Sequence, residues 1–434
     1  MEKFFQFHQH NTNLRTETLA GATTFLTMVY IVVVNPAILS ETGMDFGAVF
    51  VATVLAASLS TLIMGVFANY PIAIAPGMGL NAYFAYSVVG QNGVGWETAM
   101  GAVLVAGLLF LLLTLTTLRE SLIKAIPTSL KNGITAGIGL FIAFIGLKSA
   151  GIIVDDEVNL VGLGDLHAPV TILSLAGLLF TLVLMTLRVP GALFFGMVCT
   201  GVVGWLSGML HIEGPWVAAP PSLAPTFGEA VVALPDVFSQ GLYAVIFAFL
   251  LVTLFDTTGT MIGVAEQAGL MKNGVFPRMK PALFADALGM TTGAVMGTTP
   301  TSAYIESSAG VATGGRTGFT AVVVGVLLLG TLFFAPVVSA IAALPAITAP
   351  TLIIVGCFMM GGLAKVEWND FDEAFPAFIV MLSMPLTSSI ATGIALGFIT
   401  YPLLKIVRGN FRDVHPLLYV FMLLFTLQLA FLPE

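Results

Sequence analysis

Long apolar runs, separated by short polar stretches, follow one another along almost the whole chain. A helix needs about 20 apolar residues to cross the hydrocarbon core of a bilayer. The runs have this helical length and lack the ~10-residue alternation of a transmembrane β-barrel. The pattern therefore predicts an all-α, polytopic membrane protein with about fourteen segments in two sets of seven. We expect the first set at 18–38, 46–68, 78–90, 97–118, 129–149, 168–187 and 190–210, and the second at 238–265, 279–298, 303–313, 318–336, 349–364, 372–386 and 387–407.

Two of these segments, 78–90 and 303–313, are too short to cross a bilayer alone. Each is third in its set, and each follows an extended stretch that contains a proline, Pro76 or Pro300. An odd number of segments per set inverts the second set relative to the first. Short, Pro/Gly-interrupted segments at matching positions are typical of transporters in which the substrate binds between two such repeats. The alternative is that both are ordinary loops between helices.

Composition and charge narrow the function further. Of the 434 residues, 9% are charged, against about 25% in soluble domains, so the chain's main partner is the lipid bilayer. The net charge of −8 argues against nucleic acid as a partner. No glycine–lysine phosphate loop is present, which excludes ATP as a direct energy source. The segments contain neither a metal-ligand set nor a nucleophile–base pair, so an enzyme is not indicated and no cofactor is expected.

Basic residues fall at alternate ends of the segments, while the loop 211–237 has no Lys or Arg. By the positive-inside rule, we expect a multi-pass protein of the cytoplasmic (inner) membrane with a cytoplasmic N-terminus. The run 415–432 lies outside the two sets, and the sequence leaves open whether it spans the membrane or lies against the bundle. The basic residues that carry this prediction are Lys3, Arg15, Arg119, Lys124, Lys131, Arg188, Lys272, Arg278, Lys280 and Arg316.

Three acidic residues, Asp256, Asp286 and Glu306, lie within predicted segments of the second set. A carboxylate at the centre of a transmembrane helix costs ~2.5–3.5 kcal/mol on insertion scales, so such residues usually have a function. The alternative is structural: each acid could accept hydrogen bonds from a neighbouring broken-helix end.

The surroundings of these acids indicate the chemistry of a ligand. We expect Glu306 just inside the second half-helix, whose first N–H groups lack partners and carry partial positive charge. Thr257, Thr258 and Thr260 are expected to supply hydroxyl groups around Asp256. Two acids beside backbone donors suit a flat heterocycle that has both N–H donors and carbonyl or ring-nitrogen acceptors. They suit an inorganic anion poorly, because an anion requires cationic partners.

Small and polar residues complete the predicted site. We expect Asn81 on the first half-helix, opposite Glu306, and we expect Gly79 and Ser307 to permit close backbone approach. None of the five histidines lies in a predicted central segment. Carboxylates would therefore carry any transported proton, since burial without a cation favours their protonated form. Coupling to sodium remains open.

Several motifs resemble those of the AzgA-like purine permeases, a branch of the second nucleobase–cation symporter family. They are RTETLAGATTFLTMVYIVVVNPAIL (15–39), APGMGLNAYFAY (75–86), LFDTTGTMIGVAEQAGL (254–270), TSAYIESSAGVATGGRTG (301–318) and FPAFIVMLSMPLTSSIATGIALGFITY (375–401). The resemblance implies a UraA-like 7+7 inverted repeat with short strands before the half-helices. It also implies a core domain (15–118 and 238–340) that slides as an elevator against a gate domain (119–237 and 341–434), and a homodimer through the gate.

By motif match, the resemblance implies that Glu306 binds the purine ring edge and that Asp256 is its partner on segment eight. Asp286 would support the core and proton coupling, and Asn81 would influence the site from the first half-helix. Thr260 stands where uracil permeases have a histidine, which favours carboxylate coupling over a histidine relay.

We therefore expect a secondary transporter that imports adenine, guanine or hypoxanthine by proton symport. A uracil, xanthine or urate permease of the same fold is the main alternative. An anion exchanger is disfavoured, because Glu306 would repel its substrate.

Overall fold

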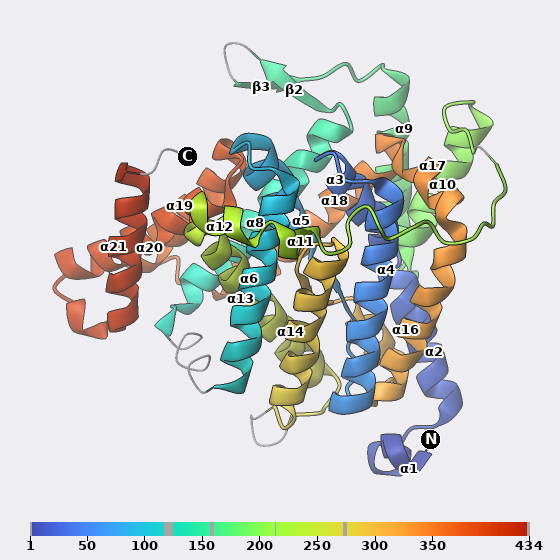
Figure 1. The fold of residues 1–434 in the computed structure, drawn as a ribbon, viewed down its shortest axis with the longest axis horizontal. Coiled ribbons are helices and arrows are strands. Elements are labelled where there is room, and N and C mark those ends of the chain that lie inside the picture. The colour runs from blue at the N-terminus through green and yellow to red at the C-terminus, as the bar shows by residue number, and fades with distance from the viewer. Residues whose placement is uncertain (1, 117–124, 157–159, 213, 272–275, 432–434) are drawn as a thin grey trace.

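The computed structural model describes residues 2–116, 125–156, 160–212, 214–271 and 276–431, and the chain is almost entirely helical (Figure 1). In this part of the chain, nine helices are long and apolar enough to cross a membrane. The predicted all-α, multi-pass architecture is therefore confirmed. The basic residues Arg119, Lys124 and Lys272 lie outside the described residues.

The elements of the two repeats follow the same order, with a strand and a short helix third in each. The first repeat comprises α2 (Leu14–Met28) with α3 (Ile31–Ser40), α4 (Phe46–Ile63) with η2 (Met64–Ala68), β1 (Ile74–Pro76) with α5 (Met78–Ala82) and η3 (Tyr83–Gln91), α6 (Trp96–Leu115), α8 (Thr128–Ser149), α9 (Pro169–Thr186) and α10 (Ala192–Leu206). The second comprises α13 (Tyr243–Gln267), α14 (Met279–Met296), β4 (Thr301–Ala303) with α15 (Ser307–Ala312), α16 (Gly318–Gly330) with η4 (Thr331–Phe334) and α17 (Ala335–Ala342), α18 (Pro345–Met359) with η5 (Met360–Lys365), α19 (Phe371–Thr387) and α20 (Ile390–Val407).

Shorter elements lie before, between and after the repeats. They are α1 (Glu2–Phe5), η1 (Phe7–His10), the hairpin β2 (Ile153–Asp156)–β3 (Leu160–Leu163), α11 (Glu229–Val232), α12 (Leu234–Ser239), η6 (Phe411–Asp413) and α21 (Pro416–Phe431). The helix α21 packs against α20, and its Phe421 and Phe425 rings contact Phe247 of α13 and Phe398 of α20. The run 415–432 thus contributes a helix that packs against α13 and α20.

Two predicted segments differ from the structure in ways that matter for the site. The first segment, predicted as continuous over 18–38, is divided at residues 29–30 into α2 and α3. The second short segment, predicted at 303–313, follows a strand at Thr301–Ala303, and its six-residue helix starts only at Ser307. The backbone after Pro300 remains extended because it pairs with another strand, which a single-segment pattern does not show.

The two short strands come from opposite repeats and pair with each other. β1 runs antiparallel to β4, with Ala75 opposite Ser302, and all their residues are buried. The pairing continues past the strand ends, where Gly77 donates to the Pro300 carbonyl and Tyr304 to the Ala73 carbonyl, both at 2.9 Å. Backbone polar groups inside a bilayer need such partners, because lipid supplies none.

Packing divides the helices into two bundles. In the first bundle, α16 packs against α2 and α4, and α14 packs against α4 and α6. In the second, α8 packs against α18 and α19, while α9 packs against α10 and α18. The first bundle contains α2–α6 and α13–α17, and the second contains α8–α10 and α18–α20.

Buried amide and hydroxyl groups hold the interrupted helices of the first bundle together. Asn35 on α3 donates to Thr53 on α4 at 2.6 Å and to Thr298, just before β4, at 2.9 Å. Its carbonyl oxygen accepts a hydrogen bond from Thr299, which also donates to Asn81 on α5. The Asn35 side chain of the first repeat thereby holds Thr298 and Thr299, which precede strand β4 of the second repeat.

Replacing Asn35 with alanine should destabilise the protein by about 1–2 kcal/mol, because it leaves buried hydroxyl groups without their partner. Thermal unfolding of the purified, detergent-solubilised protein measures this as a lower Tm. Thr186→Ala is the matched control, since that exposed hydroxyl bonds only to the Leu182 carbonyl of its own helix. Equal Tm values for Asn35→Ala and the unsubstituted protein would contradict the role of this network.

Candidate functional site

A cavity of about 300 Å³ lies where the two half-helices meet, between the two bundles. This volume falls at the lower end of the range typical of small-molecule sites. We call it the central cavity. The first bundle lines it with Tyr30, Gly77, Met78, Gly79, Asp256, Thr260, Ser302, Ala303, Tyr304, Ile305 and Glu306, and the second with Thr135, Val355, Phe358, Met359, Gly361 and Gly362. Its charged groups all belong to the first bundle.

The Glu306 carboxylate is held by Tyr30, whose hydroxyl donates to Oε1 at 2.6 Å. Tyr30 lies at the division between α2 and α3. Glu306 occupies the position immediately before α15 and not, as predicted, a position inside the half-helix. The N–H groups of Ser307 and Ser308 already donate to the carbonyls of Tyr304 and Ile305. The prediction of free donors at this helix start is therefore wrong, because the turn after β4 uses them.

The free donors come from the other half-helix instead. Met78 and Gly79 form the first turn of α5, where N–H groups have no acceptor within the helix. Both residues line the central cavity. A Cβ atom at Gly79 would clash with Cγ2 of Ile138 on α8. Glycine at this position therefore lets the second bundle approach the half-helix closely.

Asp256 and Thr260 lie one turn apart on α13, and both face the central cavity. The neighbouring threonines do not share this position, contrary to expectation. The Thr257 hydroxyl donates to Oδ2 of Asp286 at 2.6 Å, and the Thr258 hydroxyl is buried without a hydrogen-bond partner among the described residues. Consecutive residues of a helix point in different directions. Of these three threonines, only Thr260 therefore faces the central cavity together with Asp256.

The remaining predicted residues lie behind the strands and do not line the cavity. Asp286 is fully buried and also accepts a hydrogen bond from Thr301 of β4 at 3.0 Å. Ser307 accepts a hydrogen bond from the Ala73 N–H at 3.0 Å. Asn81 is fully buried and accepts from Thr299. These three side chains support the backbone that carries the site.

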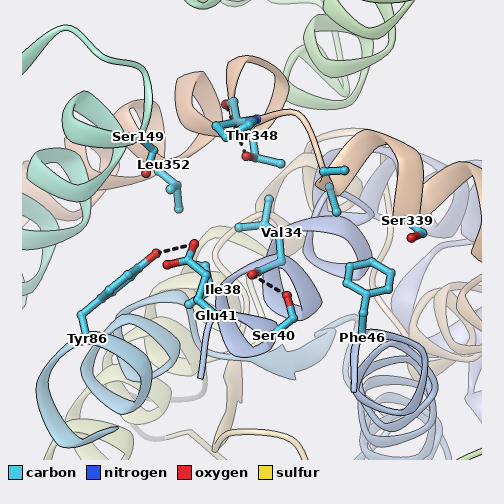
Figure 2. Close-up of a pocket in the computed structure, with 14 residues that line it drawn as sticks. Val34, Ile38, Ser40, Glu41, Phe46, Tyr86, Ser149, Ser339, Thr348 and Leu352 are labelled. Atoms are coloured by element: carbon cyan, nitrogen blue, oxygen red, sulfur yellow. Dashed lines mark hydrogen bonds between the residues drawn. The ribbon is translucent and has the colours of Figure 1, made fainter. Parts of the chain in front are cut away.

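Two further cavities lie toward opposite ends of the bundle. The proximal vestibule, about 620 Å³, reaches from Thr23 on α2 to Arg188 after α9 and shares Ile305, Glu306 and Phe358 with the central cavity. The distal vestibule, about 330 Å³, lies beside the far end of α3 and has no lining residue in common with the central cavity (Figure 2). Of these two vestibules, only the proximal one therefore adjoins the central cavity.

Sequence reasoning missed Tyr30, Met78 and Thr135 as cavity residues. A tyrosine within the apolar run TMVYIVVVNP was a usable signal, because a buried phenol group usually needs a hydrogen-bond partner. Met78 and Thr135 gave no comparable signal, since either would fit an ordinary packed helix. In the described part of the chain, no group of three or more His, Cys, Asp or Glu residues could hold a metal ion.

Comparison with solved structures shows the same architecture. The transmembrane domain of a cyanobacterial bicarbonate transporter, BicA, matches with a TM-score of 0.63 at 15% identity, covering 88% of this chain and 97% of that domain. SLC26A9 matches with a TM-score of 0.62 at 14% identity, covering 94% of this chain and 66% of that one. These likenesses confirm the 7+7 inverted-repeat fold.

Comparison of sequences shows the family. The permease family matches residues 15–396. The guanine/hypoxanthine permease PbuO of Bacillus subtilis is 56% identical over 99% of this chain and 100% of its own length. The adenine permease AdeP of Escherichia coli is 47% identical over 100% of this chain and 96% of its own length. The family resemblance inferred from the motifs is thus confirmed. This chain belongs to the permease family, and it is a membrane transporter rather than an enzyme.

Proposed function

We propose that this protein imports a purine nucleobase, adenine, guanine or hypoxanthine, by proton symport with an elevator-type mechanism. The observation that carries the proposal is the Glu306 carboxylate, held by Tyr30 in a cavity that also contains backbone donors at Met78 and Gly79. A purine has N–H donors and ring acceptors along one flat edge. The carboxylate would accept from the donors, and the start of α5 would donate to the acceptors. The full-length similarity to purine permeases supports the same substrate class.

Asp256 is the proposed proton carrier. It lines the same cavity as Glu306, and Thr260 stands one turn further along α13. Two carboxylates that face one cavity repel each other when both are ionised, so a proton bound to Asp256 would relieve this repulsion. Asp286 accepts hydrogen bonds from Thr257 on α13 and from Thr301 on β4. It would therefore hold β4 and α13 in a fixed relative position during transport.

The division of the site between the bundles supports an elevator movement. The first bundle, which corresponds to the proposed core domain (15–118 and 238–340), supplies both acids and the free donors. The second, which corresponds to the proposed gate domain (119–237 and 341–434), supplies mainly apolar residues and glycines. A substrate bound to the first bundle would therefore move with that bundle past the mainly apolar surface of the second bundle. The proposal includes a cytoplasmic N-terminus, so that the proximal vestibule opens to the cytoplasm, and a homodimer through the gate domain.

Purified protein in proteoliposomes should accumulate radiolabelled hypoxanthine, guanine or adenine when an inward proton gradient is imposed. A sodium gradient alone should not drive accumulation. Asp256→Asn should abolish gradient-driven accumulation, because it removes the proposed proton carrier. Competition by unlabelled uracil, xanthine and urate identifies the preferred base.

Empty liposomes and an uncoupler provide the controls for this experiment. The absence of uptake of all three purines by correctly reconstituted protein would overturn the proposed substrate class. Accumulation driven by sodium in place of protons would overturn only the proposed coupling.

Glu306→Gln should weaken purine binding about 10- to 150-fold, since the loss of hydrogen bonds to a charged group costs about 1.5–3 kcal/mol. Equilibrium binding of radiolabelled purine to the solubilised protein measures this change. Glu266→Gln, at the exposed end of α13, is the matched control and should bind normally. Unchanged affinity in a folded Glu306→Gln protein would remove Glu306 from the binding site.

A further inference from the structure

The distal vestibule is a built pocket that the proposed transport site does not use. Its volume is about 330 Å³, slightly more than that of the central cavity. It lies between the two bundles: α3, α4, η3 and α17 line one side, and the end of α8 and the start of α18 line the other. Figure 2 shows Glu41 and Tyr86 together on one side of this space, with Phe46 farther along and Leu352 and Thr348 across from them.

Glu41 and Tyr86 repeat the chemistry of the central cavity. The Tyr86 hydroxyl donates to Oε1 of Glu41 at 3.2 Å, as Tyr30 donates to Oε1 of Glu306. The other carboxylate oxygen of Glu41 has no hydrogen-bond partner among the described residues. Partial burial raises the pKa of the Glu41 carboxyl, and the hydrogen bond from Tyr86 opposes this effect. A carboxylate with a free oxygen beside a phenol group can accept hydrogen bonds from adjacent N–H groups of a flat heterocycle.

The distal vestibule is aligned with the central cavity along α3. Tyr30, Val34, Ile38 and Glu41 follow one another at intervals of four, four and three residues, so they lie on one face of the helix. Tyr30 lines the central cavity, and the other three line the distal vestibule. One member of each acid–tyrosine pair, Tyr30 or Glu41, therefore lies at an end of α3 on the same side of this helix.

The second bundle presents a matching face on α18. Thr348 and Leu352 line the distal vestibule, and Val355, one turn further on, lines the central cavity. Val34 and Ile38 on α3 are buried, as are Leu352 and Val355. Buried apolar residues of α3 and α18, which we call the apolar layer, therefore lie between the polar groups of the two cavities.

We propose that the distal vestibule is a second, peripheral binding site for the transported purine, with Glu41 as its recognising acid. The inference rests on the proposed function. A purine arriving at the end of the bundle away from the N-terminus binds between Glu41–Tyr86 and α18. It reaches Glu306 when the apolar layer opens. Because Glu41 is more exposed to solvent than Glu306, water competes for its hydrogen bonds, and the peripheral site holds the base more weakly.

Saturation-transfer difference NMR with hypoxanthine tests this site directly, because the method detects weak binding. Wild-type protein should give a signal, and Glu306→Gln should retain part of it through the distal vestibule. Glu306→Gln combined with Glu41→Gln should give a weaker signal than Glu306→Gln alone. Glu41→Gln alone should raise the KM for uptake from the distal face about tenfold and leave the maximal rate unchanged.

Glu97→Gln is the matched control, since Glu97 starts α6 shortly after η3 and does not line the vestibule. Tyr86→Phe is a second variant that keeps the ring and should raise KM less than Glu41→Gln does. Complete loss of the signal in folded Glu306→Gln, or equal signals from Glu306→Gln and the double variant, would overturn the peripheral site and leave the proposed function intact. No signal from wild-type protein would overturn the proposed function itself.

Discussion

The site depends on a constraint of the bilayer: every backbone N–H and C=O at its centre needs a partner within the protein. Two helices can be interrupted there only because β1 and β4 satisfy each other, with further bonds from Gly77 to Pro300 and from Tyr304 to Ala73. The interruption exposes the first turn of α5 and leaves Glu306 in a turn rather than in a helix. The strand pair therefore creates the donors and positions the acceptor of the central cavity.

Polar side chains behind the strands make this arrangement rigid. Asn35 joins α3 and α4 to the approach of β4, and Asp286 joins α13 to β4 through Thr257 and Thr301. These groups are buried and hydrogen-bonded, and a polar network in a medium of low dielectric constant is stable only when its members are paired. In the proposed mechanism, the first bundle would carry a bound base as a unit past the mainly apolar surface of the second bundle.

The sequence predicts the repeats well because transmembrane segments have a fixed length and the two short segments occupy matching positions. Glu306 and Asp256, which line the central cavity, were identifiable because acids are rare in such segments. Thr260 was identifiable only from its spacing of one helical turn from Asp256. The contact of Tyr30 with Glu306 joins residues 276 positions apart, and no local pattern specifies it. The placement of Ser307 and Asn81 behind the strands follows from the β1–β4 register, which depends on both repeats at once.

The most direct test of the central claim is an experimental density map of the protein with bound hypoxanthine or adenine. The account predicts density for the base in the central cavity, with ring N–H groups at hydrogen-bond distance from the Glu306 carboxylate and acceptors facing the N–H groups of Met78 and Gly79. A base bound elsewhere in a transport-competent protein, with Glu306 still bonded only to Tyr30, would contradict it.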